Sequence, residues 1–541
     1  MNSQYSPRTS HSGERTATNS ITGVPPPTTG GPTTTTRTSH PNNTNDEKAD
    51  LDHHEEMMTG LAPAGTVGSD GGDSRSAASV EKPKEKDGGM DLDVSSAPYG
   101  DMAQNEAATA DADAHRFKNL SWPRLTICLL VEAVALGSLS MPAAAATLGL
   151  VPFIIICIGI GFVAIYTSLH VGEMGVRFPQ IASYGDAGRV LFGRIGYEVF
   201  SIMFYLLLTL ITGSHVLTGT IAFLTISDNA ICSLAFGVIA AIILFVLALP
   251  PTFHDVAWLG FVDFASIIIA VVATMIATGI QAAKQPGGFS AVEWSAWPAE
   301  GTTFVKGMLA VTQIAFAYSF AVAQFSFQAE LKNPRDYKKA CWALGILEIF
   351  IYTATGVIIY LFVGKDVQSP ALLSAGGTMA KVAFGLALPV IYISGSINTT
   401  CVARAIHLRM YKGTKHEFIR TPKSIGVWVG LNAGLTVIAF IVAEAIPVFS
   451  DLLGLISSLF ISGFSFSFPP LFWYFILREE GPLLIGASWK RVLTTLANGG
   501  IFMMGLVLLV GGTFSSAKDI SDLFAAGEVR QPFTCDAFAS G

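Results

Sequence analysis

Long apolar stretches separated by short polar segments dominate the chain from about residue 120 onward. A helix that rises about 1.5 Å per residue needs about 20 residues to cross the hydrocarbon of a bilayer. Hydrocarbon offers the backbone no other partner, and the short alternating segments typical of a β-barrel are absent from the sequence. We therefore predict an all-α integral membrane fold with eleven transmembrane helices, at residues 125–147, 150–172, 197–224, 232–250, 256–280, 304–328, 340–363, 379–404, 425–446, 449–477 and 492–514.

The first 115 residues follow a different pattern, with runs of Ser, Thr, Pro, Gly and Asp and no long apolar stretch. Such a segment buries too little apolar surface to offset the entropy lost on ordering. We expect three regions: a disordered tail at residues 1–115, a transmembrane domain at 116–514 and a C-terminal tail at 515–541.

The charges of the loops predict the orientation in the membrane. If the N-terminal tail is cytoplasmic, the loops on that side hold sixteen Lys and Arg residues and the outer side holds six. Because cytoplasmic loops carry the excess of Lys and Arg, we expect a cytoplasmic N-terminus and, after eleven crossings, an extracellular C-terminus. Cys232 and Cys535 then lie outside, where thiols oxidise, which predicts a disulfide between them. The alternative is two unpaired thiols.

Composition agrees with a membrane protein and excludes several other classes. The 541 residues are 51% hydrophobic and only 13% charged, whereas soluble domains carry about 25% charged residues. The net charge is −7 and no basic stripe interleaved with aromatic residues occurs, so a nucleic acid is not an expected partner. The six cysteines are scattered without a CxxC pair, so we expect no bound metal and no cofactor.

The first predicted helix contains a stretch that favours a broken backbone. Gly137 and Pro142 bracket Ser138, Leu139 and Ser140, and glycine and proline both weaken a helix. Unwound backbone at this depth is tolerated only where it lines a cavity or is buried in protein. Its free N–H groups would suit a substrate carboxylate. An ordinary kinked helix is the alternative.

In folds built as five-plus-five inverted repeats, the first and sixth helices are equivalent, and both are interrupted near the middle of the membrane. The sixth predicted helix, residues 304–328, is therefore the expected counterpart of the first. It carries polar residues in an apolar run, together with aromatic residues that suit an apolar substrate side chain; plain helix packing is the alternative. The candidate binding residues in this helix are Phe316, Ala317, Tyr318, Ser319 and Phe320.

Ionisable groups within the predicted helices are candidates for coupling transport to an ion, because burying them in the membrane is costly. Glu132, His215, Asp263 and Glu348 lie within helices, and Glu330 lies at the end of the sixth. A desolvated carboxyl group can hold a proton through a conformational cycle. Structural pairing is the alternative for each. We take as coupling candidates Glu132, His215, Asp263, Glu330 and the polar residues Ser394, Ser396 and Asn398 of the eighth helix. For these last three, small-residue packing is the alternative.

Several strings resemble the neutral amino acid permeases of fungi, within the amino acid/auxin permease family. The resemblance covers roughly residues 115–535, and its strings include VEAVALGSLSMPAAAATLG at 131–149, GSHVLTGTI at 213–221, AFAYSFAVAQFSF at 315–327, DVQSPALLSAG at 366–376, ISGSINT at 393–399 and LFISGFSFSFP at 459–469. It implies a leucine-transporter-like repeat plus one extra helix, and proton symport of neutral aliphatic and aromatic amino acids at the plasma membrane. It also implies a substrate site between Gly137–Ser140 and Phe316–Phe320.

Other functions stay open at this point. A sodium-coupled or a vacuolar transporter would show a similar sequence pattern, as would an amino acid sensor that transports little. A membrane-embedded enzyme lacks support, since no nucleophile-elbow or HExxH motif is present, and no repeated filter loop suggests a channel. The tail lysines Lys48, Lys82, Lys84 and Lys86 are candidate ubiquitin acceptors; a solvated charge run is the alternative.

Overall fold

The computed structural model describes residues 121–535 apart from 251–255, 323, 329–330, 418, 420 and 479–480. The predicted tail at 1–115 lies outside these residues, as do its four candidate ubiquitin acceptors. Within the described part of the chain, the element order consists of α-helices and shorter helical turns. All eleven predicted segments fall on helical structure.

The α-helices are named in chain order. They are α2 (Trp122–Leu148), α3 (Leu150–Arg177), α4 (Tyr184–Ser227), α5 (Ser233–Ala248), α6 (Val256–Lys284), α7 (Phe304–Ala317), α8 (Gln324–Gln328), α9 (Tyr337–Val363), α10 (Gly377–Tyr411), α11 (Pro422–Ala445), α12 (Phe449–Ile456), α13 (Phe468–Phe472), α14 (Trp489–Val507) and α15 (Thr513–Ala526). Wider π-helical turns continue some of them: η7 (Ser457–Ser467) joins α12 to α13, η8 (Trp473–Leu477) follows α13, and η9 (Leu508–Gly512) joins α14 to α15.

Length and hydropathy confirm an all-α, multi-pass membrane protein. Among the described residues, eight helical stretches are long and apolar enough to cross a bilayer, and a ninth is added if the bent helix α2 counts as one span. The two remaining segments contain α5, with 16 residues, and α7, with 14 residues. Helix α7 is short because its segment is interrupted and continues as α8. Eleven crossings therefore stay a prediction.

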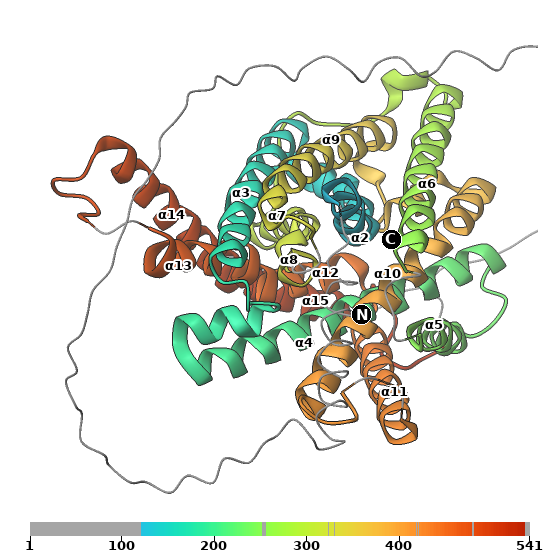
Figure 1. The fold of residues 1–541 in the computed structure, drawn as a ribbon. Coiled ribbons are helices and arrows are strands. Elements are labelled where there is room, and N and C mark those ends of the chain that lie inside the picture. The colour runs from blue at the N-terminus through green and yellow to red at the C-terminus, as the bar shows by residue number, and fades with distance from the viewer. Residues whose placement is uncertain are drawn as a thin grey trace, which may run out of the picture. The chain divides into compact units, whose positions relative to one another are not determined.

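Helices α2 and α7 lie at the centre of the helical bundle (Figure 1). Helix α2 packs against α9, α7 and α6, while α10 packs against α4 and α6. Helices α3 and α9 pack on one another beside α2. The central position of α2 follows from its composition, since its residues from Ala133 to Ala145 are nearly all buried and small or aliphatic.

The largest differences between predicted and observed boundaries are at the third and the last segment. The third segment begins at Tyr184 rather than at residue 197, because Ser183 caps a short helix by accepting a hydrogen bond from the Asp186 amide. That short helix meets the long one at Gly193, whose φ of 64° permits the kink. The last segment continues past residue 514 to Ala526, so part of the predicted C-terminal tail is helical.

The predicted disulfide between Cys232 and Cys535 is confirmed. It fastens the C-terminal segment to the start of α5, and we call this end of the bundle the disulfide end. Arg530 reinforces the attachment by donating a hydrogen bond to Glu444 of α11 at 2.8 Å, with both side chains at most 2% exposed. Ser233 also donates to the carbonyl of Thr534. The C-terminal segment is thus tied to both α5 and α11.

We expect Glu444→Gln to lower the free energy of unfolding by about 3–5 kcal/mol, because it removes the carboxylate that balances the buried charge of the Arg530 guanidinium. Thermal or denaturant unfolding in detergent measures the loss. The control is Glu198→Gln, which breaks a pair with Arg409 whose side chains are 37% and 38% exposed and should cost about 1 kcal/mol or less. If both variants lost the same free energy of unfolding, burial would not determine how much an ion pair contributes to stability.

Candidate functional site

The sixth segment is interrupted in the middle of the bundle, at the position that the sequence analysis gave. Helix α7 ends at Ala317, Tyr318 leaves helical geometry with φ −91° and ψ 34°, and a tight turn at Ser319–Ala321 precedes α8. The last carbonyl groups of a helix have no partner within it. One of them is satisfied from outside, since the Tyr352 hydroxyl of α9 donates to the carbonyl of Ala317 at 3.1 Å.

The first segment differs from the prediction, because α2 is helical throughout residues 137–140. The Ser138 and Ser140 hydroxyls donate to the carbonyls of Val134 and Gly137 in their own helix. The predicted unwinding is therefore wrong: Pro142 removes only one hydrogen bond, and the neighbouring helices hold the remainder in place. The bend of α2, 48°, lies instead between residues 131 and 133.

Gly137 allows α2 and α7 to meet at the interruption. A Cβ atom placed on Gly137 would lie 2.9 Å from both Cα and Cβ of Ala317, and 3.3 Å from the Tyr352 hydroxyl oxygen. These distances leave no room for a side chain, because the obstacle includes main-chain atoms. The candidate stretches Gly137–Ser140 and Phe316–Phe320 are thus in direct contact.

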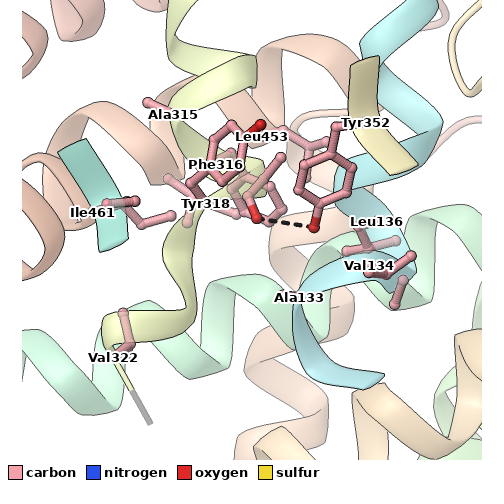
Figure 2. Close-up of a cluster of buried hydrophobic side chains, with 14 of the residues drawn as sticks. Ala133, Val134, Leu136, Ala315, Phe316, Tyr318, Val322, Tyr352, Leu453 and Ile461 are labelled. Atoms are coloured by element: carbon pink, nitrogen blue, oxygen red, sulfur yellow. Dashed lines mark hydrogen bonds between the residues drawn. The ribbon is translucent and has the colours of Figure 1, made fainter. Parts of the chain in front are cut away.

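Aromatic and sulfur groups surround the interruption. The rings of Tyr318 and Tyr352 stand nearly perpendicular, with centroids 5.2 Å apart (Figure 2). The Tyr318 hydroxyl lies 3.4 Å from the Cys157 sulfur of α3. Phe316, Ala317 and Tyr318 are buried, Ser319 is partly exposed, and the side chain of Phe320 lies outside the described residues. The site therefore combines an apolar wall with a few polar atoms.

Glu348 of α9 lies beside this cluster; the sequence analysis noted it as an ionisable group within a helix but did not choose it among the coupling candidates. It is fully buried, and neither carboxyl oxygen has a hydrogen-bond partner among the described residues. It lies one turn before Tyr352 on α9, and the Tyr352 ring packs against that of Tyr318. A buried carboxylate without a partner is costly, so this geometry favours the neutral acid. Glu348 and Tyr352 are four residues apart in a predicted helix, so the sequence already indicates that both side chains lie on one helix face.

A second polar cluster joins three helices at the bend of α2. The Ser394 hydroxyl of α10 donates to Asp263 of α6 at 2.9 Å and lies 3.5 Å from the carbonyl oxygen of Val131 in α2. Asp263 is fully buried, and its other oxygen has no partner among the described residues. Asn398 donates to the Ser394 carbonyl one turn away. We call Asp263, Ser394 and Asn398 the α6–α10 cluster.

The structure places the other coupling candidates less closely together. His215 of α4 packs against α10 at Gly395, where an added Cβ would lie 2.9 Å from the His215 Cβ, and its Nδ1 has no hydrogen-bond partner among the described residues. Ser396 donates to a carbonyl of its own helix, at Ile393. Glu330 and the side chain of Glu132 lie outside the described residues. The candidates on α4 and α6 thus contact α10 within the same two turns.

We expect Gly137→Ala to force α2 and α7 apart, lowering the free energy of unfolding by about 1–3 kcal/mol and reducing uptake. Unfolding in detergent and uptake of labelled substrate measure the two effects. Gly159→Ala in α3 is the matched control, because nothing lies within 4 Å of its Cβ position. Equal behaviour of the two variants would show that the α2–α7 contact is not tight.

The helical bundle, the interrupted central helix and the buried polar clusters are the features of an α-helical membrane transporter. Residues 118–517 match the family described as transmembrane amino acid transporter protein, and the chain belongs to that family. The N amino acid transport system protein of Neurospora crassa is 51% identical over 426 residues, covering 78% of this chain and 90% of that protein. These similarities confirm the predicted family and identify a transporter, not an enzyme.

Other proteins are more distantly similar. A transmembrane transporter of Fusarium pseudograminearum is 30% identical and covers 82% of this chain and 92% of its own length. Among solved structures, a nucleobase-cation-symport-1 family transporter in a closed conformation, with bromovinylhydantoin bound, aligns with a TM-score of 0.46 and 14% identity. That alignment covers 76% of this chain and 93% of the other.

Proposed function

We propose that the protein is a secondary active transporter that imports neutral aliphatic and aromatic amino acids by proton symport. The observation that carries the proposal is the buried Asp263, bonded to Ser394 beside the bend of a central helix. The similarity to an N amino acid transport system protein supports the substrate class. In this proposal the chain crosses the plasma membrane eleven times as a five-plus-five inverted repeat plus one helix, with its N-terminus in the cytoplasm and the disulfide end outside.

The proposed substrate site lies between Gly137–Ser140 of α2 and Phe316–Phe320 around the α7 interruption. The carbonyl end of α7 is the negative end of its dipole and suits the substrate ammonium group, with Tyr318 and Ser319 as further polar contacts. The buried ring of Phe316 suits an apolar side chain. Since Gly137 and Ala317 touch, substrate can enter only when α2 and α7 separate, and their contact corresponds to a closed state.

Asp263 is the proposed proton carrier. When protonated, it is a neutral group that fits its buried position and accepts the bond from Ser394. When ionised, it would be a buried charge with a single donor, so release of the proton requires access to water. The nearby carbonyl of Val131 adjoins the bend of α2, so protonation there can be coupled to movement of that helix.

A cavity of about 110 Å³ lies beside α8, at the end of the bundle opposite the disulfide. Its lining includes Phe325 and Gln328 of α8, and Gln328 donates a hydrogen bond to the carbonyl of Gly172 in α3. Breaking this bond would let α8 swing away from α3. We propose that this movement releases the substrate to the cytoplasm.

Uptake of labelled phenylalanine into proteoliposomes tests the proposal. We expect faster accumulation when the outside is acidic, inhibition by other neutral amino acids, and an inward current, because a zwitterion plus one proton carries one net charge worth about 2.3 kcal/mol per 100 mV. Replacing sodium by choline should change nothing. Electroneutral uptake would contradict proton symport, and binding without uptake would favour a sensor. Fluorescence of the tagged protein in cells distinguishes the plasma from the vacuolar membrane.

We expect Asp263→Asn to abolish accumulation driven by a pH gradient while preserving exchange of labelled for unlabelled amino acid, because the amide fits the site but cannot carry the proton. Ser394→Ala should keep accumulation and shift its pH dependence, since it removes only the donor. Glu348→Gln is the matched variant at the other buried acid. If Glu348→Gln abolishes accumulation and Asp263→Asn does not, Glu348 is the carrier.

A further inference from the structure

Two carboxyl groups meet at the disulfide end, away from the substrate and proton sites proposed above. Asp451 lies in the first turn of α12 and is 1% exposed. Asp519 lies in α15 and is partly buried. Ser516, one turn before Asp519, lies against Gly454, one turn after Asp451, so the two carboxyl groups face one another across the contact between α12 and α15. Helices α12 and α15 pack on each other and on α7. The pair thus bridges the two helices that cover the first half of α7.

A hydrogen bond between two carboxyl groups requires a proton. Ionised carboxylate oxygens only accept hydrogen bonds, and two adjacent carboxylates repel one another, so the pair is stable in this geometry when it holds one shared proton. The other oxygen of Asp451 has no partner among the described residues, so no second donor stabilises an ionised Asp451.

Two buried hydroxyl groups lie about one turn before Asp519 in α15. The hydroxyls of Ser515 and Ser516 are fully buried and have no partner among the described residues. The Ser516 oxygen would lie 3.0 Å from a Cβ on Gly454, one turn after Asp451 in α12. It therefore projects from α15 into the contact between α12 and α7.

The charged groups around the pair leave it net acidic. Lys306 of α7, Asp522 of α15 and Glu528 beyond it all act on Asp519, and Lys518 pairs with Asp522. Helix α4 also packs on α12, and its charged group at this end, Asp228, pairs with Lys381. The neighbouring turns η7 and η9 contain no titratable residue. Lys306 can balance one negative charge of the pair, so a second ionisation would be repulsive.

We propose that Asp451 and Asp519 form a proton-binding latch that holds α12 against α15 over α7. Loss of the shared proton makes the carboxylates repel, separates the two helices and opens the packing around Ser516 to water. The inference rests on the proposed function only for its placement on the outside of the cell. There, external acid would keep the latch closed, and neutral medium would release it.

Cysteine labelling on intact cells tests the latch. Ser516→Cys is treated with a membrane-impermeant maleimide at a series of external pH values, alone and combined with Asp519→Asn. The asparagine amide donates to Asp451 without titrating and keeps the helices together. We expect labelling in neutral medium to be about tenfold slower with Asp519→Asn, the factor for an interaction of about one pK unit, and equal rates in acid. Rates are compared at equal pH, so the ionisation of the thiol cancels.

Two controls make the result specific. Asp522→Asn removes an exposed carboxyl one turn away and should leave the labelling rate unchanged, whereas Asp451→Asn should reproduce the effect of Asp519→Asn. The protein that retains Ser516 measures background labelling of the other cysteines. Surface biotinylation confirms that each variant is present.

The proposal is overturned if Ser516→Cys resists labelling at every pH, or if neither asparagine variant slows it. Labelling requires neither substrate nor transport. Failure of the latch would therefore leave proton symport untouched, and failure of uptake with intact pH-dependent labelling would refute only the proposed function.

Discussion

The structure depends on providing hydrogen-bond partners for the backbone groups of an interrupted helix in a place that water does not reach. Helix α7 ends in the middle of a bundle whose outer residues are apolar, so its last carbonyl groups lose their partners within the helix. Solvent cannot replace these hydrogen bonds there. The Tyr352 hydroxyl supplies a donor to Ala317, and the close approach of Gly137 shields the same point. The interruption can therefore exist only at the centre of the bundle, where α2, α3 and α9 surround it, and the proposed substrate site takes its position from this constraint.

The buried acids differ in how far they are compensated. Glu444 meets a guanidinium, and the resulting pair ties the C-terminal segment to α11. Asp263 has one hydroxyl donor, and Glu348 has no partner among the described residues. Full compensation suits a permanent structural link, because neither partner need change its protonation. Partial compensation suits a group that gains and loses a proton, because the group is neutral while it is buried and can ionise when a movement admits water.

The two ends of the bundle are held together by different kinds of contact. The disulfide end combines a covalent bond, a buried ion pair and the carboxyl pair between α12 and α15. At the opposite end, α8 has five residues, lies beside a cavity, packs on α3 and donates a hydrogen bond to α3 from Gln328. A transporter must open its two sides in turn. The contacts at the disulfide end connect whole helices, whereas in the proposed transport cycle the other side opens by movement of one short segment.

Hydropathy by itself determined the all-α membrane fold and the positions of the eleven segments, because hydrocarbon leaves an apolar chain no alternative to the helix. Alternation of the segments placed Cys232 and Cys535 at one end, and the disulfide followed. Tertiary packing decided where the backbone breaks. The first segment has Gly137 and Pro142 and stays helical there, while the sixth has neither residue type at its interruption and breaks. Local propensity is worth only a few kcal/mol, so the neighbours that supply or withhold hydrogen bonds determine the outcome. For the same reason the sequence could show Asp263, Glu348 and Asp451 as acids in helices, but not which partner each would meet.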